Sequence, residues 1–287
     1  MLDGVMLLWF VLTALSLLYV AIDIRSTPES TVLKWGFILL TAYTGPVGAF
    51  LYVLGCREPL PGLHERFVAT RWRQVLGSTM HCVAGDGLGI MAGAVIARLL
   101  HLHGIADIAL EYMLGFGFGW SIFQALAMRG MAGGSYRRSL STTFFPELLS
   151  MNFLMAGMVT MMTFGMSHVP AAMSPLRPAF WFVMSMALLV GFITAYPMNW
   201  WLVSHHMKHG MMTDRLIPKS HDDATDRSGH IHQAPTGGSG TERPESKSAT
   251  DSGPPTVSTS LLAGMTLVSF MAFAVGLTVA ATVFGGM

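Results

Sequence analysis

The chain has 287 residues, of which 52% are hydrophobic and 11% are charged, and its mean hydropathy is +0.52. Soluble domains average roughly 25% charged residues, so this composition argues against an ordinary soluble domain and predicts a membrane protein. The formal net charge of +1 gives no electrostatic basis for binding nucleic acid, and two cysteines, Cys56 and Cys82, are too few for a disulfide framework.

Seven apolar segments follow one another along the chain, each long enough to cross a bilayer as a helix. The first, 4–22, has Asp3 at its start, where a signal peptide carries positive charge, so we expect this helix to be retained. The second, 33–54, contains Gly45-Pro46 in its middle, where we expect a kink. The other segments are 75–97, 105–128, 145–166, 178–204 and 259–284.

A polar segment, 213–258, separates the last two apolar segments. It is rich in Asp, Ser, Thr, Gly, Pro and His, a composition that predicts disorder. We therefore expect an all-α polytopic membrane bundle of about seven helices with four parts. These are an N-terminal two-helix hairpin over 1–68, a four-helix core over 69–212, the disordered loop over 213–258 and a C-terminal helix over 259–287.

The basic residues are distributed unevenly over alternate connections between the predicted spans. Thirteen of the 17 Lys and Arg residues lie in the connections 55–74, 128–145 and 204–258, and four lie in 23–34, 98–105 and 167–178. The positive-inside rule then places the N-terminus in the cytoplasm and, after seven crossings, the C-terminus outside.

Four of the central segments carry polar or ionisable side chains at depths where the bilayer is apolar. Burying such groups in a membrane is costly, and they mark functional sites by default. On the same helix as three of them, Gly85, Gly89 and Gly93 are spaced by four and predict a face for close helix packing. The predicted polar core for transport consists of His81, Cys82, Asp86, Glu111, Gln124, Glu147, Asn152, Tyr196 and Asn199.

These side chains also have a structural interpretation. Asp86 can form a hydrogen bond that only joins two helices, and Glu147, at the start of the segment 145–166, can cap a helix N-terminus. The asparagines and the tyrosine can serve as hydrogen-bonding links between helices. His81 and Asp86 are about 140° apart around the helix axis, so we expect each to meet another helix rather than one another.

Sulfur and imidazole donors are abundant, with 23 methionines and 11 histidines. Soft sulfur ligands suit copper(I), although methionine is also a flexible filler of apolar space. A stripe of methionines rises from Glu147 along one helix face, which predicts either a soft-metal path or an ordinary helix seam. His205 and His209 are four apart and can face one metal ion. The candidate metal ligands are His81, Cys82, Asp86, Glu147, Met151, Met155, His205, His206 and His209.

Five stretches of the sequence together form a recognisable pattern. They are WRQVLGSTMHCVAGDGLGIMAGA, EYMLGFGFGWSIFQAL, MAGGSYRRSL, FFPELLSMNFLMAGM and AYPMNWWLVSHHMKHGM. With them, residues 70–212 resemble an uncharacterised prokaryotic membrane family, domain-of-unknown-function family 4396. The resemblance implies a four-helix core with extra spans and a His-rich variable loop, in a bacterial inner (plasma) membrane, and it brings no established activity. In matching positions the family's polar signature falls on His81, Cys82, Asp86, Glu111, Gln124, Glu147, Asn152, Pro197 and Asn199.

Two function hypotheses from different classes follow from these patterns. The first is handling or transport of a cation, with copper or another transition metal as the expected ligand and protons as counter-ions. The alternative is a non-catalytic membrane assembly or partner-binding subunit, whose polar residues only fix packing against a partner protein or a second copy. The sequence contains no nucleotide-binding loop, haem signature or metalloprotease motif. An enzyme is therefore the less favoured class, and a hydrolytic carboxylate pair at Asp86 and Glu147 lacks an identified substrate.

Overall fold

The computed structural model describes residues 2–57, 60, 62–129, 133–208, 210 and 257–283. Over these residues the chain is all-α, which confirms the predicted fold class of a helical membrane bundle. The longer helices are α1 (Leu2–Asp23), α2 (Thr31–Thr44), α3 (Pro46–Gly55), α5 (Arg71–Leu99), α6 (Ile105–Phe118), α8 (Tyr136–His168), α9 (Pro178–Ser204) and α10 (Thr259–Val283). The short ones are η1 (Ile24–Ser26), α4 (His64–Val68), the π-helical turn η2 (Gly119–Gln124), α7 (Ala125–Ala127) and η3 (Pro170–Met173).

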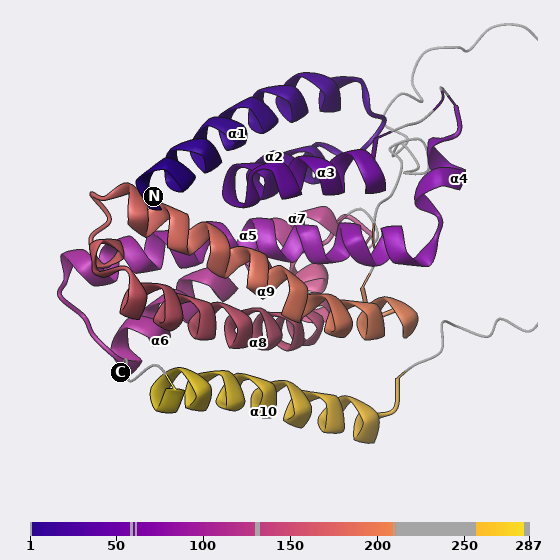
Figure 1. Ribbon diagram of the computed structural model, residues 1–287. Coiled ribbons are helices and arrows are strands. Elements are labelled where there is room, and N and C mark those ends of the chain that lie inside the picture. Colours follow the sequence, from indigo (N-terminus) through magenta and orange to yellow (C-terminus); the bar gives the residue numbers. More distant parts are fainter. Residues whose placement is uncertain are drawn as a thin grey trace, which may run out of the picture.

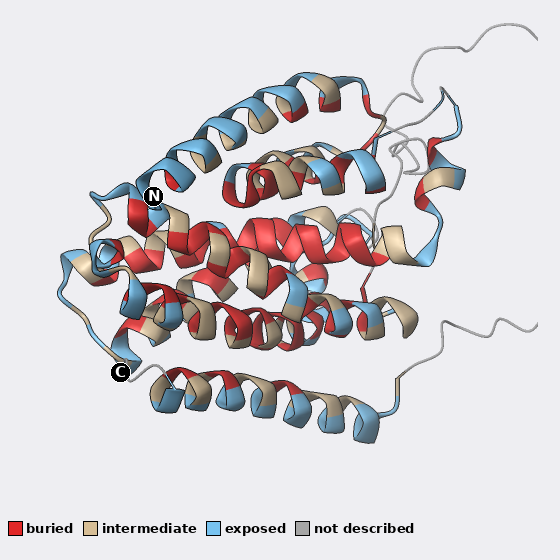
Figure 2. Ribbon diagram, viewed as in Figure 1, coloured by how far each residue is buried: buried red, intermediate tan, exposed pale blue. Residues whose placement is uncertain are grey.

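The core of the bundle is formed by α5, α8 and α9, with the rod of α6, η2 and α7 packed beside α5 (Figure 1). Figure 2 shows α5 buried over most of its length, whereas α1 and α10 lie at the periphery and are largely exposed. In the described part of the chain, five helices are long and apolar enough to cross a membrane: α1, extended by η1, and α5, α8, α9 and α10. Helices that remain apolar on their exposed side fit a lipid environment rather than water.

The segment predicted as a kinked second span is instead a helical hairpin. Gly45 ends α2 with φ +57°, and Pro46 starts α3 in the opposite direction. The rings of Phe37 and Tyr52 lie 5.5 Å apart, whereas in one continuous helix these residues would be about 22 Å apart. The hydroxyl of Tyr52 donates to Asp23, which lies before α2. Because the hairpin returns to the end of the bundle where it started, it does not add a crossing.

Both described ends of the chain lie at the same end of the bundle (Figure 1). The indole of Trp9 donates to Ser185 at 3.1 Å, which places the start of α1 beside the start of α9. Side chains of α8 bond to α10 in the same order along both helices, at Asn152–Ser269 and Thr160–Gly276, so these helices are parallel. Since α8 ends where α9 begins, α10 ends at the same end of the bundle at which α1 begins. We call this end the Leu99 end and the opposite one the Lys208 end.

Candidate functional site

A cluster of five polar side chains lies inside the core, and we call it the polar centre. It consists of Cys82 and Asp86 from α5, Glu147 from α8, Asn199 from α9, and Lys208 from just beyond α9. None of these residues is more than 2% exposed. Charged groups are rarely buried to this degree unless they are paired, so the pairing within the cluster decides what it can do.

The ammonium group of Lys208 is the hub of the polar centre. Its Nζ donates to Cys82 Sγ at 2.6 Å, to Glu147 Oε2 at 2.9 Å and to Asn199 Oδ1 at 3.3 Å. Cys82 Sγ in turn donates to Glu147 Oε2 at 3.3 Å. Burial lowers the pKa of Lys208, but Cys82 and the Glu147 carboxylate outweigh this and raise the pKa above its usual value. The ammonium therefore stays charged and uses all three of its donors on fixed acceptors.

The chain after α9 places Lys208 by turning back on the bundle. His206 has φ +57°, and the backbone N–H of Met207 donates to the carbonyl of Leu202. Helix α9 therefore ends with a residue in the left-handed region of backbone conformation. Two residues beyond Lys208, a Cβ added at Gly210 would lie 2.5 Å from the Cα of Gln74 at the start of α5. The turn and this close approach hold the lysine against the core, so its side chain reaches inward rather than into water.

The two carboxyl groups of the polar centre meet at a glycine in η2. A Cβ built on Gly119 would lie 3.0 Å from Glu147 Oε1 and would overlap Asp86 Oδ1. Asp86 has no hydrogen-bond partner for either oxygen within the described structure, and Glu147 Oε1 has none. The two groups are close enough to share a hydrogen bond when one of them is protonated. Among the described residues, Lys208 is the one cation whose contacts place it at the polar centre, so it neutralises one carboxylate and the other needs a proton or a further cation.

Two more of the predicted residues border the polar centre. His81 interacts with Gln124 through its side chain, while its Nε2 has no hydrogen-bond partner among the described residues. The ring of His81 packs edge-on against Phe123 at 5.7 Å between centroids. Thus His81 and Gln124 lie in the same region as Cys82, Asp86 and Glu147.

The remaining predicted polar residues lie outside the polar centre, and two of them, Asn152 and Tyr196, link helices. Asn152 accepts from Tyr112 of α6 at 2.7 Å and donates to Ser269 of α10 at 3.0 Å. The hydroxyl of Tyr196 donates to the backbone carbonyl of Trp72 at 3.2 Å. Glu111 lies toward the Leu99 end, away from the polar centre. These contacts fit the interpretation that treats such residues as hydrogen-bonding links between helices.

Glu147 does not cap a helix, because α8 starts at Tyr136, eleven residues before Glu147. The cap is Ser135, whose hydroxyl accepts from the backbone N–H of Arg138 at 3.4 Å. Pro146 therefore lies inside α8 rather than in its first turn. A carboxylate in the middle of a core helix, paired with a buried lysine, has no role in helix capping.

Among the described residues, the predicted metal ligands do not form a metal site. Met151 and Met155 are fully buried among apolar side chains of the core, as a helix seam requires. His205 hydrogen-bonds the carbonyl of Trp201 at 2.9 Å and stacks on its ring, and His209 lies outside the described residues. Within the described ranges, no group of three or more His, Cys, Asp or Glu side chains is arranged to hold a metal ion.

Lys208 is the central residue that the sequence analysis missed. It sits in the stretch SHHMKHGMM, where the histidines and methionines attract attention to metal binding. Electrostatics offers a signal by which the sequence could have identified this residue. Two carboxylates buried in a core predict a compensating cation, and Lys208 follows a core helix by only a few residues.

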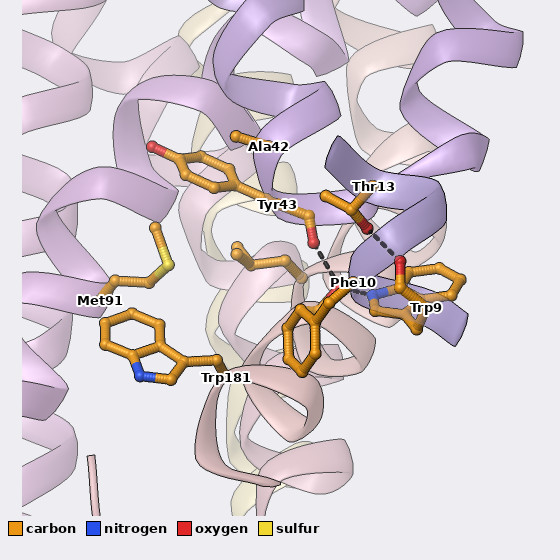
Figure 3. A pocket seen from close by; sticks show the side chains of 9 residues that line it. Trp9, Phe10, Thr13, Ala42, Tyr43, Met91 and Trp181 are labelled. Carbon is orange, nitrogen blue, oxygen red and sulfur yellow. Dashed lines mark hydrogen bonds between the residues drawn. The ribbon is translucent and has the colours of Figure 1, made fainter. Parts of the chain in front are cut away.

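A pocket lies apart from the polar centre, between α1, α2, α5 and α9 (Figure 3). Its walls carry Trp9 and Thr13 of α1, Tyr43 of α2 and Met91 of α5. The hydroxyl of Ser185 bonds to the carbonyl of Tyr43 and accepts from the indole of Trp9. These hydrogen bonds join α1 and the α2–α3 hairpin to the core. The residues that line the pocket include no carboxylate or histidine.

The model of a family described as a domain of unknown function (DUF4396) matches residues 71–208. The matched region starts with α5 and ends at Lys208, so it contains the whole polar centre. No curated protein and no solved structure matches the chain significantly.

Proposed function

Since residues 71–208 belong to the domain-of-unknown-function family DUF4396, whose description states no activity, we propose from the polar centre that this membrane protein handles a cation. The candidate cargo is a copper-type transition-metal ion. One observation carries the proposal: the polar centre already holds a cation, the ammonium of Lys208, between a cysteine sulfur and two oxygen atoms. The cargo ion would take the place of this ammonium.

The donor atoms around Lys208 suit a soft or borderline metal. Cysteine thiolate and imidazole select copper and zinc, and carboxylate can complete their coordination. Cys82 and Glu147 face the ammonium directly, and the unpartnered atoms of Asp86 and His81 border them. In the described arrangement these four side chains do not form a metal site, so metal binding requires that they close around the ion when Lys208 withdraws.

Charge balance favours a monovalent cargo. Replacing one buried ammonium by one copper(I) ion leaves the net charge of the polar centre unchanged, whereas a divalent ion adds a charge to a site of low dielectric constant. Binding to sulfur requires Cys82 to lose its proton, because only the thiolate is a metal ligand. Glu147 Oε2, to which the Cys82 thiol already donates at 3.3 Å, is placed to accept that proton.

The proposal is tested by the metal content of purified protein after exposure to copper(I) under reducing conditions. We expect Lys208→Met to bind more copper than the wild type, because the competing ammonium is gone, and the added Cys82→Ser change to abolish this gain. The matched control is Lys34→Met, since Lys34 only bonds to a backbone carbonyl at the surface. If Lys208→Met folds and binds no more copper than the control, the proposal fails.

The alternative function, an assembly or partner-binding subunit, is favoured by a different observation. Asn199 donates to Ser150 of α8 at 2.8 Å, and Asn152 joins α6, α8 and α10. In this case the polar residues only fix helix packing, and Lys208 pins the end of α9. Changes at Cys82 and Lys208 would then alter thermal stability in detergent while leaving copper binding unchanged.

We further propose that the protein lies in a bacterial inner membrane with the Lys208 end in the cytoplasm. Ten of the Lys and Arg residues in the described ranges lie at that end, and Arg98 and Arg177 lie at the Leu99 end. The hairpin of α2 and α3 is what brings Arg25 and Lys34 to the basic side. By the positive-inside rule both termini then lie outside, which replaces the earlier expectation for the N-terminus.

A further inference from the structure

A second pair of carboxyl groups lies in α6 near the Leu99 end, and we call it the outer acidic pair. Asp107 and Glu111 are four residues apart and share one helix face. Glu111 is 1% exposed, and neither of its oxygens has a hydrogen-bond partner in the described structure. Asp107 Oδ2 lies 3.4 Å from Arg98 Nη2, while its Oδ1 is unpartnered.

The glycine face of α5 seals Glu111 into the protein. A Cβ added at Gly93 would lie 2.8 Å from the Cα of Glu111 and 3.4 Å from its Cγ. The predicted face of Gly85, Gly89 and Gly93 thus packs against α6 and η2. Because the two backbones approach so closely, the Glu111 carboxyl group is held inside the α5–α6 seam.

The charges around Glu111 do not balance it as a carboxylate. The groups that act on the outer acidic pair are Arg98 of α5, the two acids of α6 themselves, and His103 of the preceding connection. Arg98 is shared with Met166 of α8, whose sulfur lies 3.4 Å from Nη2. One arginine faces two carboxyl groups, and an ionised carboxylate without hydrogen bonds is very costly to bury. Glu111 is therefore held with a proton.

We propose that Glu111 is a proton-binding site in the outer half of the membrane, which exchanges its proton with the outside water through Asp107. Asp107 lies in the first turn of α6, one helical turn closer to the Leu99 end. Release runs outward: Glu111 gives its proton to the ionised Asp107 carboxylate, which passes it to a water molecule at the surface to form hydronium. Reloading is the reverse, in which hydronium loses an O–H proton to Asp107 and Asp107 passes it to the ionised Glu111.

This inference rests on the proposed function, to which it adds the counter-ion. Asp86 lies two helical turns before Gly93 on α5, about 10 Å along the helix axis. Tyr112, next to Glu111 in sequence, is close enough to Asp86 to interact with it electrostatically. A cation site toward the cytoplasm and a proton site toward the outside thus stand in series along the α5–α6 seam, an order that suits exchange of a cation for a proton.

The first test is the reaction of the wild-type protein, in phospholipid vesicles at neutral pH, with a hydrophobic carbodiimide. This reagent labels carboxyl groups that carry a proton in an apolar setting, and peptide mapping by mass spectrometry locates the label. We expect Glu111 to be labelled, and labelling to decline as the pH is raised until the proton is lost. A folded wild-type protein without label at Glu111 overturns the inference, and this measurement needs no variant.

The second test follows proton movement into the same vesicles with an enclosed pH-sensitive dye and an imposed membrane potential. We expect Glu111→Gln to reduce the flux to that of protein-free vesicles, while Asp3→Asn, at an exposed position on α1, leaves it unchanged. Unchanged flux in Glu111→Gln overturns the inference even when Glu111 is labelled. Copper binding by the Lys208→Met protein is measured separately. Loss of flux without copper binding would therefore reject the proposed function and retain the proton site.

Discussion

At the scale of single residues, the polar centre distinguishes groups that are paired from groups that are not. Glu147 accepts from both Lys208 and Cys82 through one oxygen, whereas Asp86 accepts from nothing in the described structure. The same type of side chain at the same depth thus has two different energetic roles. Removing one member of a charged pair leaves the other charge buried without a counter-charge. Removing a carboxyl group that has no partner instead removes the free-energy cost of burying it.

We predict that Glu147→Gln destabilises the protein strongly, by about 3–5 kcal/mol, because Lys208 is left as an uncompensated buried charge. The measurement is thermal or denaturant unfolding in detergent. A double variant with Lys208→Met should be more stable than Glu147→Gln alone, since it removes both charges. Equal stability of the single and double variants would show that the two side chains are not coupled.

Asp86→Asn is predicted to have the opposite effect. No donor reaches the oxygens of Asp86 in the described structure, and an amide can donate to Glu147 as a protonated carboxyl group would. The neutral Asn should therefore leave thermal stability unchanged or raise it. If this residue instead held helices together, as the packing interpretation requires, the variant would unfold at a lower temperature. Unfolding experiments on the variant and the wild type at the same pH separate these outcomes.

At the scale of helices, the sequence predicts the positions of the apolar segments well, but it predicts less well where a helix ends inside such a segment. Apolar segments of about twenty residues and the spacing of Gly85, Gly89 and Gly93 are periodic signals, and the structure follows them. The turn at Gly45 is a local event: a glycine before a proline permits either a kink or a reversal, and only the contact of Phe37 with Tyr52 decides between them. Tertiary packing, which a single sequence does not reveal, makes that choice.

The π-helical turn is an element whose role can be tested with a matched pair of glycines. We predict that Gly119→Ala lowers the unfolding temperature, because its Cβ would overlap the carboxyl group of Asp86. Gly117→Ala is the control, since nothing lies within 4 Å of a Cβ there and alanine is the better helix former. Equal unfolding temperatures for the two variants would mean that Asp86 moves aside without cost.

At the scale of the whole molecule, the hairpin decides at which end of the bundle the described ends of the chain lie. The sequence pattern predicts seven apolar segments. If each of them crossed the membrane, the number of crossings would be odd and the two termini would lie on opposite sides. The hairpin of α2 and α3 leaves α1, the α6–α7 rod, α5, α8, α9 and α10 to run the length of the bundle, so both ends meet at the Leu99 end. The basic residues then separate far more cleanly between the two ends, with Arg25 and Lys34 now on the basic side.

We predict that reporters fused to either terminus will both lie outside the cytoplasm. A phosphatase that is active only outside should be active at the N-terminus and at the C-terminus, and a fluorescent protein that matures only inside should be dark at both. A reporter inserted in the connection before α4, next to Gly62, should show the reverse pattern as the internal control. Termini on opposite sides would contradict the hairpin, and two cytoplasmic termini would reverse the proposed orientation.

The turn η2 has a further consequence for how this chain tolerates length changes. A π-helical turn accommodates one residue more than an α-helical turn does, so the segment Gly119–Gln124 holds a surplus position. Deleting a single residue there would restore regular i→i−4 bonding and rotate the upstream part of α6 by about 100° relative to Gln124. Such a deletion would preserve the length of the hydrophobic rod and its connections, yet turn Glu111 out of the seam. Most single deletions in a membrane helix are tolerated poorly. At this position, a single deletion would rotate the whole α6 face that carries Glu111 as one unit.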